Sequence, residues 1–138
     1  MQFNSDFSQP VVIQPNQYQF IDSPLAGVSR MILERAGNEV ARATSIVRYA
    51  PGSGYSAHTQ FDRHIHAGGE EILVLEGMFC DEHGQYPTGS WLRNPRYSAH
   101  APFTLEQGAL IYVKVGHIDA GLMGDRFIHP PTLEESAQ

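Results

Sequence analysis

The stretch "DRHIHAGGEEILVLEG", residues 62–77, places two histidines and two glutamates close together. His64 and His66 are two residues apart, so on a β-strand both side chains leave the same face, about 6.6 Å apart along the backbone. Two neutral imidazole nitrogens and one carboxylate oxygen suit Fe(II), Mn, Ni, Zn or Cu, whereas Ca and Mg prefer shells made of oxygen. A His-x-His pair alone is commonly two surface histidines, so the metal-site hypothesis depends on the residues around it.

A turn and a pair of glutamates follow the histidines. Residues 67–69, Ala-Gly-Gly, can reverse the chain because glycine tolerates positive φ, and this brings a carboxylate back beside the imidazoles. Successive side chains of a strand point to opposite faces, so only one of Glu70 and Glu71 can join the histidines. The alternation by itself leaves open which of the two it is.

The elements that must hold these residues are predicted to be strands. Short apolar runs rich in Val, Ile, Leu and Tyr, separated by Gly, Pro, Asn and Asp clusters, indicate an all-β fold. The expected strands are residues 17–21, 29–37, 41–50, 70–82, 89–94 and 109–116. Residues 28–36 also carry a weak helical period, but a glycine-asparagine turn and a second β-rich run follow them, which favours a strand. The 138 residues suit one domain, with terminal segments at about 1–10 and 128–138.

Composition excludes several classes of partner. The net charge of −6 and the nine basic residues give phosphate backbones and anionic lipids little to bind, so nucleic acid and membranes are not expected partners. The first ten residues lack the basic start and apolar run of a secretory signal, and no stretch approaches the ~20 apolar residues of a spanning helix. We therefore expect a cytoplasmic protein. Cys80 is the only cysteine, so no internal disulfide can form, and its expected role is that of a small buried hydrophobe.

The large apolar side chains are assigned to the core, because they are more numerous than a ligand pocket requires. They are Phe61, Phe79, Trp91, Phe103 and the run 72–75. Glycine-rich phosphate loops, a G-x-S-x-G elbow and an H-E-x-x-H helix are absent from the sequence, which excludes nucleotide binding and nucleophilic triads of those kinds.

The histidine stretch resembles the first motif of the cupin superfamily, which is H-x-H, three or four residues, E, six residues, G. His64, His66, Glu70 and Gly77 fit these spacings. Of the two glutamates only Glu70 leaves six residues before the glycine, so the resemblance selects it as the anionic ligand. Glu71 is then expected to face outward. The resemblance implies a single cupin domain, a small antiparallel β-barrel or double-stranded jelly roll made of two facing sheets.

The second cupin motif is G, five residues, P-x-G, two residues, H, three residues, N. The segment "GSWLRNPRYSAHAPFT" supplies Gly89, Pro95, His100 and Thr104 at those spacings. The resemblance therefore makes His100 the fourth ligand. Tyr97 stands where the motif has glycine and Thr104 where it has asparagine, which predicts that the turn before His100 is built differently.

From about residue 55 to residue 115 the sequence is similar to the cupin domain of ChrR-type anti-sigma factors. The similarity is carried by the "GGEE" turn, "LVLEG", the "DEHGQYPTG" hairpin and "RNP" before the final histidine. In that family the equivalents of the four ligands bind zinc, and the same group of small cupins includes iron-dependent dioxygenases that cleave diketones and hydroxylated aryl ketones. Residues 1–50 do not resemble the helical domain that clasps a sigma factor, so a sigma factor is not an expected partner. A homodimer is expected from the resemblance.

Three imidazoles and one glutamate would hold one divalent transition metal per chain, Zn or Fe(II), with Mn or Ni as alternatives. The net charge of such a site is +1, and one or two coordination positions stay open for a small molecule. Three functions fit: a dioxygenase-type enzyme acting on a small oxygenated molecule, a non-enzymatic zinc-binding sensor or regulatory cupin, and a cupin whose metal is structural.

Five further side chains are candidates for substrate binding or for supporting the ligands at the barrel mouth: His58, Arg63, Arg93, Tyr97 and Tyr112. Each has an ordinary alternative. The two arginines could pair an anionic substrate or be solvated charges at strand edges. The two tyrosines could aim a hydroxyl inward or pack as plain aromatics. His58, which stands where the first motif has glycine, could support a ligand or lie on the surface.

Overall fold

The structure is a computed structural model that describes residues 1–38, 41–54, 64–65 and 68–118, with positions 64 and 65 described by their backbone. These residues form four long strands: β3 (Val28–Gly37), β4 (Ala41–Tyr49), β6 (Glu70–Asp81) and β10 (Phe103–Val115). The short elements are β1 (Gln2–Phe3), the 3-10 turn η1 (Pro15–Gln17), β2 (Ile21–Asp22), β5 (His64–Ile65), β7 (Gly84–Pro87), β8 (Trp91–Asn94) and β9 (Ala99–His100). The prediction of an all-β fold is confirmed.

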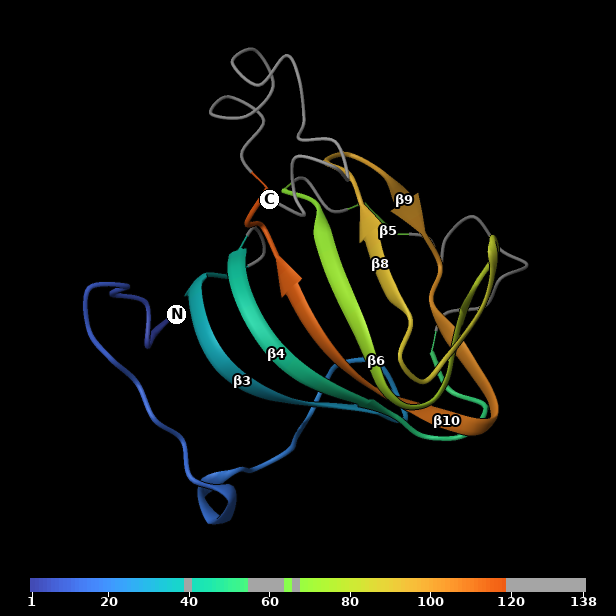
Figure 1. Cartoon of the computed structure of the whole chain (residues 1–138), viewed down its shortest axis with the longest axis horizontal. Coiled ribbons are helices and arrows are strands. Elements are labelled where there is room, and N and C mark those ends of the chain that lie inside the picture. Colours follow the sequence, from blue (N-terminus) through green and yellow to red (C-terminus); the bar gives the residue numbers. More distant parts are fainter. Residues whose placement is uncertain (39–40, 55–63, 66–67, 119–138) are drawn as a thin grey trace, which may run out of the picture.

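One antiparallel sheet of eight strands makes up most of the structure. Its order is β1-β3-β4-β10-β6-β7, with β2 added beside β3 and β8 beside β6. The four long strands curve together, and β8, β9 and β5 lie across from β3 and β4 on the other side of the curve (Figure 1). We expected two facing sheets. In the described residues, hydrogen bonding joins eight strands into one sheet, and the second sheet holds only β5 and β9.

The core lies on the concave face of this sheet. Ile72 and Val74 of β6 face the same way as Ile111 and Val113 of β10, and all four are buried. The Phe79 ring packs edge-on against Tyr49 within this core, with 5.6 Å between the ring centroids. Strict alternation along two paired strands therefore gives the sheet one apolar face.

The core assignment is correct for Ile72, Val74 and Phe79, which are 2%, 1% and 1% exposed, and wrong for two other side chains. Leu73 is 38% exposed and Trp91 is 56% exposed. These two residues are register partners on neighbouring strands and lie on the face opposite to the core. The continuous apolar run of residues 72–75 therefore did not indicate a strand that is buried on both faces. Phe103 is half-buried, and Phe61 lies outside the described residues.

Five of the six expected strands largely coincide with observed ones, including residues 28–36, where the strand is confirmed over the helix. The strand predicted over residues 17–21 is wrong except at Ile21, which lies in β2. Pro15 has no N–H for a ladder and begins the turn η1, and strand pairing starts only at Ile21. Residues 84–87, within the "DEHGQYPTG" hairpin, form β7, which pairs with the end of β6.

Candidate functional site

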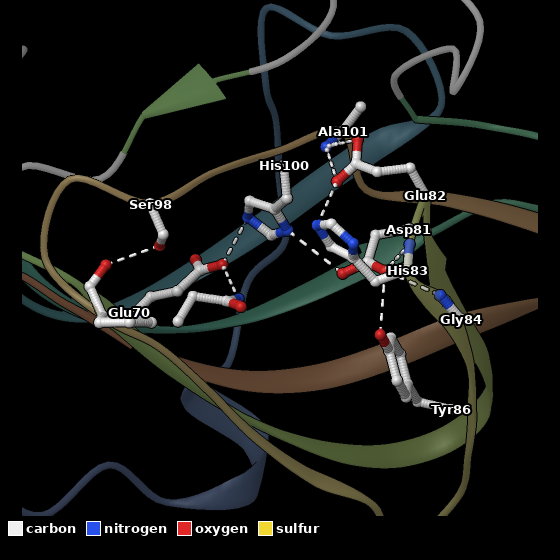
Figure 2. Close-up of polar contacts among 11 residues, drawn as sticks. Glu70, Asp81, Glu82, His83, Gly84, Tyr86, Ser98, His100 and Ala101 are labelled. Atoms are coloured by element: carbon white, nitrogen blue, oxygen red, sulfur yellow. Dashed lines mark hydrogen bonds and ion pairs between the residues drawn. The ribbon is translucent and has the colours of Figure 1, made fainter.

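The candidate site is centred on a buried contact between Glu70, the first residue of β6, and His100, the last residue of β9. Glu70 Oε1 lies 2.5 Å from His100 Nε2, and the two residues are 4% and 2% exposed (Figure 2). Burial of a carboxylate and an imidazole is costly unless they are paired, and this contact supplies the pairing. The structure brings together two of the four expected ligands.

Close backbone approach explains the glycine pair that precedes Glu70. A Cβ on Gly68 would lie 2.5 Å from the Cα of Gly116, and Gly69 has a φ of +71°. The N–H of Gly116 also donates to the carbonyl of Gly69, which ties the start of β6 to the end of β10. The glycines therefore fix the point at which the chain enters the sheet with Glu70 facing the core.

The two glutamates face opposite sides, as strand alternation requires. Glu71 contacts the Nη2 of Arg93 at 3.1 Å in a pair whose side chains are 28% and 57% exposed. The expected orientations of Glu70 and Glu71 are both observed. Arg93, one of the candidates for anion binding, lies on the outer face with Glu71 rather than beside Glu70.

Both central side chains are held by partners that the sequence analysis did not identify. Asn94 is the register partner of Glu70 on β8, and its Nδ2 donates to Glu70 Oε1 at 2.9 Å. Asp81 Oδ2 lies 3.6 Å from Nδ1 of His100, so the other ring nitrogen is directed at Glu70. Asn94 belongs to the "RNP" segment and Asp81 opens the "DEHGQ" hairpin, so the cupin resemblance had marked both segments without assigning these roles.

Asp81 is itself fixed by three donors. Its Oδ1 accepts hydrogen bonds from the Tyr86 hydroxyl at 2.9 Å and from the backbone N–H groups of His83 at 2.8 Å and Gly84 at 3.1 Å (Figure 2). Burial raises the pKa of Asp81, but the contact with His100 and the hydrogen bonds from His83 and Tyr86 outweigh burial and hold the pKa below its usual value. Asp81 is therefore an anion whose position the hairpin sets.

The two carboxylates change the basicity of the histidine between them. Burial lowers the pKa of His100, but its contacts with Asp81 and Glu70 and the charges of both carboxylates outweigh burial and raise the pKa to about 9. In the metal-free protein His100 thus carries a proton at neutral pH. Burial and the hydrogen bond to Asp81 also raise the pKa of Tyr86 to about 12, so its hydroxyl remains a donor.

The remaining ligand candidates are only partly described. Strand β5 pairs with β9 so that the Cα of His64 is opposite that of His100. His66 lies outside the described residues, as do His58 and Arg63. Among the residues that the structure describes, no group of three or more His, Cys, Asp or Glu side chains is placed to hold a metal ion. The four-ligand site therefore stays a prediction.

Two other candidates lie away from Glu70 and His100. Tyr112 lines a separate cavity on the outer face of the sheet, together with Glu34 and Thr44, because its neighbours in β10 occupy the inner face. Tyr97 is 68% exposed. Neither tyrosine is placed to aim its hydroxyl at the site.

The turn before His100 keeps a glycine-like backbone although its residue is tyrosine, which corrects our expectation of a different construction. Tyr97 has a φ of +66°, the left-handed region that favours glycine. Ser98 closes the turn, since its backbone N–H and its hydroxyl both donate to the carbonyl of Pro95. The Tyr97 ring points outward with the Arg96 guanidinium 5.3 Å from its centre, so the bulky side chain meets no obstacle.

A cavity of about 520 Å³ opens in front of the pair. Its lining includes Glu70, His100, Ile72, Phe79, Arg30 and Arg35. A space of this size suits a small organic molecule, and its wall combines apolar side chains with a few charged groups. The two arginines come from β3 and were not identified from the sequence.

An antiparallel, curved sheet that carries a buried histidine and glutamate at its cavity is the architecture of a cupin. The model of the ChrR cupin-like domain family matches residues 8–119. The chain therefore belongs to the ChrR cupin-like family, as the sequence resemblance indicated.

Solved structures support the same fold. An RmlC-like cupin protein from Ralstonia eutropha JMP134 is 12% identical, with a TM-score of 0.63 over 78% of this chain and 68% of that chain. An acetylacetone dioxygenase from Acinetobacter johnsonii is 19% identical, with a TM-score of 0.58 over 78% of this chain and 72% of that one. The complex of Rhodobacter sphaeroides SigE with the anti-sigma ChrR is 19% identical, with a TM-score of 0.57 over 74% of this chain and 50% of that one.

At these identities the similarity shows the fold alone. No curated protein matches the chain. None of the helices in the described residues is long and apolar enough to span a membrane.

Proposed function

We propose that the protein is a metal-binding cupin that acts on a small oxygenated organic molecule as a dioxygenase-type enzyme. One divalent transition metal per chain, Zn or Fe(II), would be held by His64, His66, Glu70 and His100. The observation that carries the proposal is the buried contact between Glu70 Oε1 and His100 Nε2 at the wall of a cavity.

The two described ligands suit a transition metal. An imidazole nitrogen and a carboxylate oxygen, both buried and aimed at one another, are donors that Zn and Fe(II) accept. A divalent cation bound to the same two atoms would replace the proton that His100 carries in the metal-free protein. When bound, Fe(II) would supply redox chemistry with O2 and zinc would supply Lewis acidity.

The chain's own residues orient the ligands and keep water out. Asp81 holds the His100 ring through Nδ1, and Asn94 holds one oxygen of Glu70. Partners of this kind fix the direction of a metal ligand and raise its affinity. The apolar side chains of Ile72 and Phe79 line the cavity and limit the water that surrounds a bound molecule.

The second candidate is a non-enzymatic zinc-binding sensor or regulatory cupin. The membership in the ChrR cupin-like family favours it, since one fold relative is a complex between an anti-sigma ChrR and SigE. The dioxygenase is favoured by the fold relative that is an acetylacetone dioxygenase. A cupin with a purely structural metal is the third possibility, and the cavity beside the ligands speaks against it.

Metal analysis and oxygen uptake test the proposal. We expect about one transition metal per chain after gentle purification, and O2 consumption when the Fe(II) protein meets acetylacetone or a hydroxyaryl ketone. Glu70→Gln should lower metal affinity at least tenfold and lower oxygen uptake with it, while Glu71→Gln retains both. Retained metal without oxygen uptake on any such compound would favour the sensor, and absence of metal uptake would refute the proposal.

Two further expectations belong to the proposal. The chain should form a homodimer, which light scattering at micromolar concentration would test. It should act in the cytoplasm, a compartment that suits its lone, buried Cys80, and cell fractionation would test this.

A further inference from the structure

Two arginines line the same cavity as Glu70 and His100. Arg30 and Arg35 come from β3, which lies three strands away from β6 in the order of the sheet. They are not the arginines that the sequence suggested for this role. Their placement bears on which molecule the cavity accepts.

A β-bulge turns both arginines inward. Residues five apart on a regular strand face opposite sides, yet Arg30 pairs with Val47 and Arg35 with Ala43, two residues that line the cavity together from β4. The register of β3 shifts between Ile32 and Glu34, where β3 carries one extra residue. Bulges re-aim side chains in this way, and here the result is two cations on one face.

The sheet register also places Arg35 in one row with Glu70. Arg35 is opposite Ala43, Ala43 is opposite Val115, and Val115 is opposite Glu70. Three strand spacings of about 4.8 Å separate the ends of the row by about 14 Å along the sheet, and the curvature shortens the direct path. Only an alanine and a valine stand between, so the row leaves space for a small molecule that touches both ends.

Neither arginine is neutralised within the described part of the chain. No carboxylate there lies within ion-pair distance of Arg30 or Arg35, although acidic residues outnumber basic ones by 15 to 9. Among the described residues, Arg35 donates to the carbonyls of Gly37, at 3.3 Å, and Asn38, at 2.5 Å. Partial burial and the charge of Arg30 hold the pKa of Arg35 below its usual value. Two half-buried cations on the same wall of a cavity gain from a bound anion.

We propose that Arg30 and Arg35 bind a carboxylate group of the small molecule that occupies this cavity. The substrates are then oxygenated organic acids, with the carboxylate at β3 and the oxygenated end toward Glu70. This names the substrate class of the proposed function and rests on it for the orientation of the molecule. A guanidinium offers parallel donors that match a carboxylate, and this gives both affinity and direction.

Binding of acetopyruvate and of its methyl ester tests the proposal, because the two compounds share the diketone and differ in charge. Calorimetry on the zinc-loaded protein should show the acid binding at least tenfold more tightly than the ester. Arg30→Met and Arg35→Met should each lower affinity for the acid about tenfold and leave the ester nearly unchanged. Arg48→Met is the matched control, since Arg48 lies on the outer face of β4, 4.8 Å from the centre of the Phe20 ring.

A lysine substitution separates the loss of the guanidinium from misfolding of the variant. Arg35→Lys keeps the positive charge but loses the paired N–H donors of the guanidinium. It should therefore retain part of the preference for the acid, whereas Arg35→Met should lose that preference. Circular dichroism and zinc content are measured for every variant. Equal binding of acid and ester to the unchanged protein, a preference that survives in both methionine variants, or no binding of either compound would overturn the proposal.

The two proposals fail in distinguishable ways. If the protein takes up no zinc, the same titrations are made on the metal-free protein, where the preference for the acid depends on the arginines alone. A preserved preference for the acid without zinc uptake would refute the proposed metal site and support the proposed anion site. Zinc uptake without a preference for the acid would support the metal site and refute the anion site.

Discussion

Exchange of each glutamate of the adjacent pair, one at a time, tests the assignment of the site most directly. Glu70→Gln keeps the size of the side chain but replaces a carboxylate with a weak amide donor. We expect metal affinity to fall at least tenfold, which is about 1.4 kcal/mol, because even the loss of a supporting partner has that effect. Glu71→Gln should leave metal affinity within twofold.

The magnitudes for stability follow from the surroundings of each carboxylate. Glu70 is 4% exposed and contacts both His100 and Asn94, so its exchange should lower the free energy of unfolding of the metal-free protein by about 1–3 kcal/mol. Glu71 makes one exposed ion pair with Arg93, which is worth about 0–1 kcal/mol. The two variants therefore differ in both readouts, although the residues are neighbours.

Zinc titration against a competing chelator measures the affinities, and urea unfolding of the metal-free variants measures stability. His83→Ala serves as a further control, because this histidine is exposed at 64% of its side chain and contacts Glu82. Loss of zinc binding in Glu71→Gln, with binding retained in Glu70→Gln, would reverse the inward assignment of every residue on β6 and refute the reasoning.

Three other predictions concern the pKa of His100, the reactivity of Cys80 and the turn before Glu70. In the metal-free protein the pKa of His100, about 9, lies above its ordinary value of 6.5, so its stabilising contribution is full below pH 6.5 and lost as pH rises through 9. Urea unfolding across this range should show that loss in the unchanged protein, and a His100→Gln variant with the same slope would contradict it. Burial, followed by the charge of Asp81, raises the pKa of Cys80, which is 0% exposed, so thiol reagents should modify it far more slowly in the native than in the unfolded protein. Rapid native labelling would show that this thiol is accessible. Gly69→Ala and Gly52→Ala both put alanine at a φ near +70°, but only at Gly69 does a Cβ meet other atoms, with Ile118 Cδ1 at 2.7 Å. Gly69→Ala should therefore cost more than the roughly 1–2 kcal/mol of the backbone strain that both share, and thermal unfolding that gives equal losses would contradict it.

The spacing of residues in the sequence predicted much of the local structure. Alternation indicated that Glu70 and Glu71 face opposite sides, and the resemblance to the cupin motif, through its spacing to Gly77, selected which one faces the core. The long strands were also predictable, because apolar runs between turn residues are a local signal. His100 was found through a motif, without knowledge of what surrounds it.

Other features required the tertiary structure, since they depend on which strands pair and in what register. Asp81 is 19 residues from His100 in sequence, and the fold brings its carboxylate to the imidazole through the β6–β7 hairpin. Trp91 seemed apolar enough for the core, yet its strand is paired so that the ring faces outward. Side-chain type does not reveal which face of a sheet will be covered.

The arginines of β3 show most clearly what could not be predicted from the sequence alone. Five residues separate Arg30 from Arg35, and a period of two places them on opposite faces. One extra residue, between Ile32 and Glu34, reverses the alternation, and nothing in the local sequence marks that position because the bulge is defined by pairing with β4. The sequence determined that the protein has two arginines on one strand, and only the paired sheet decided that both face the cavity of Glu70 and His100.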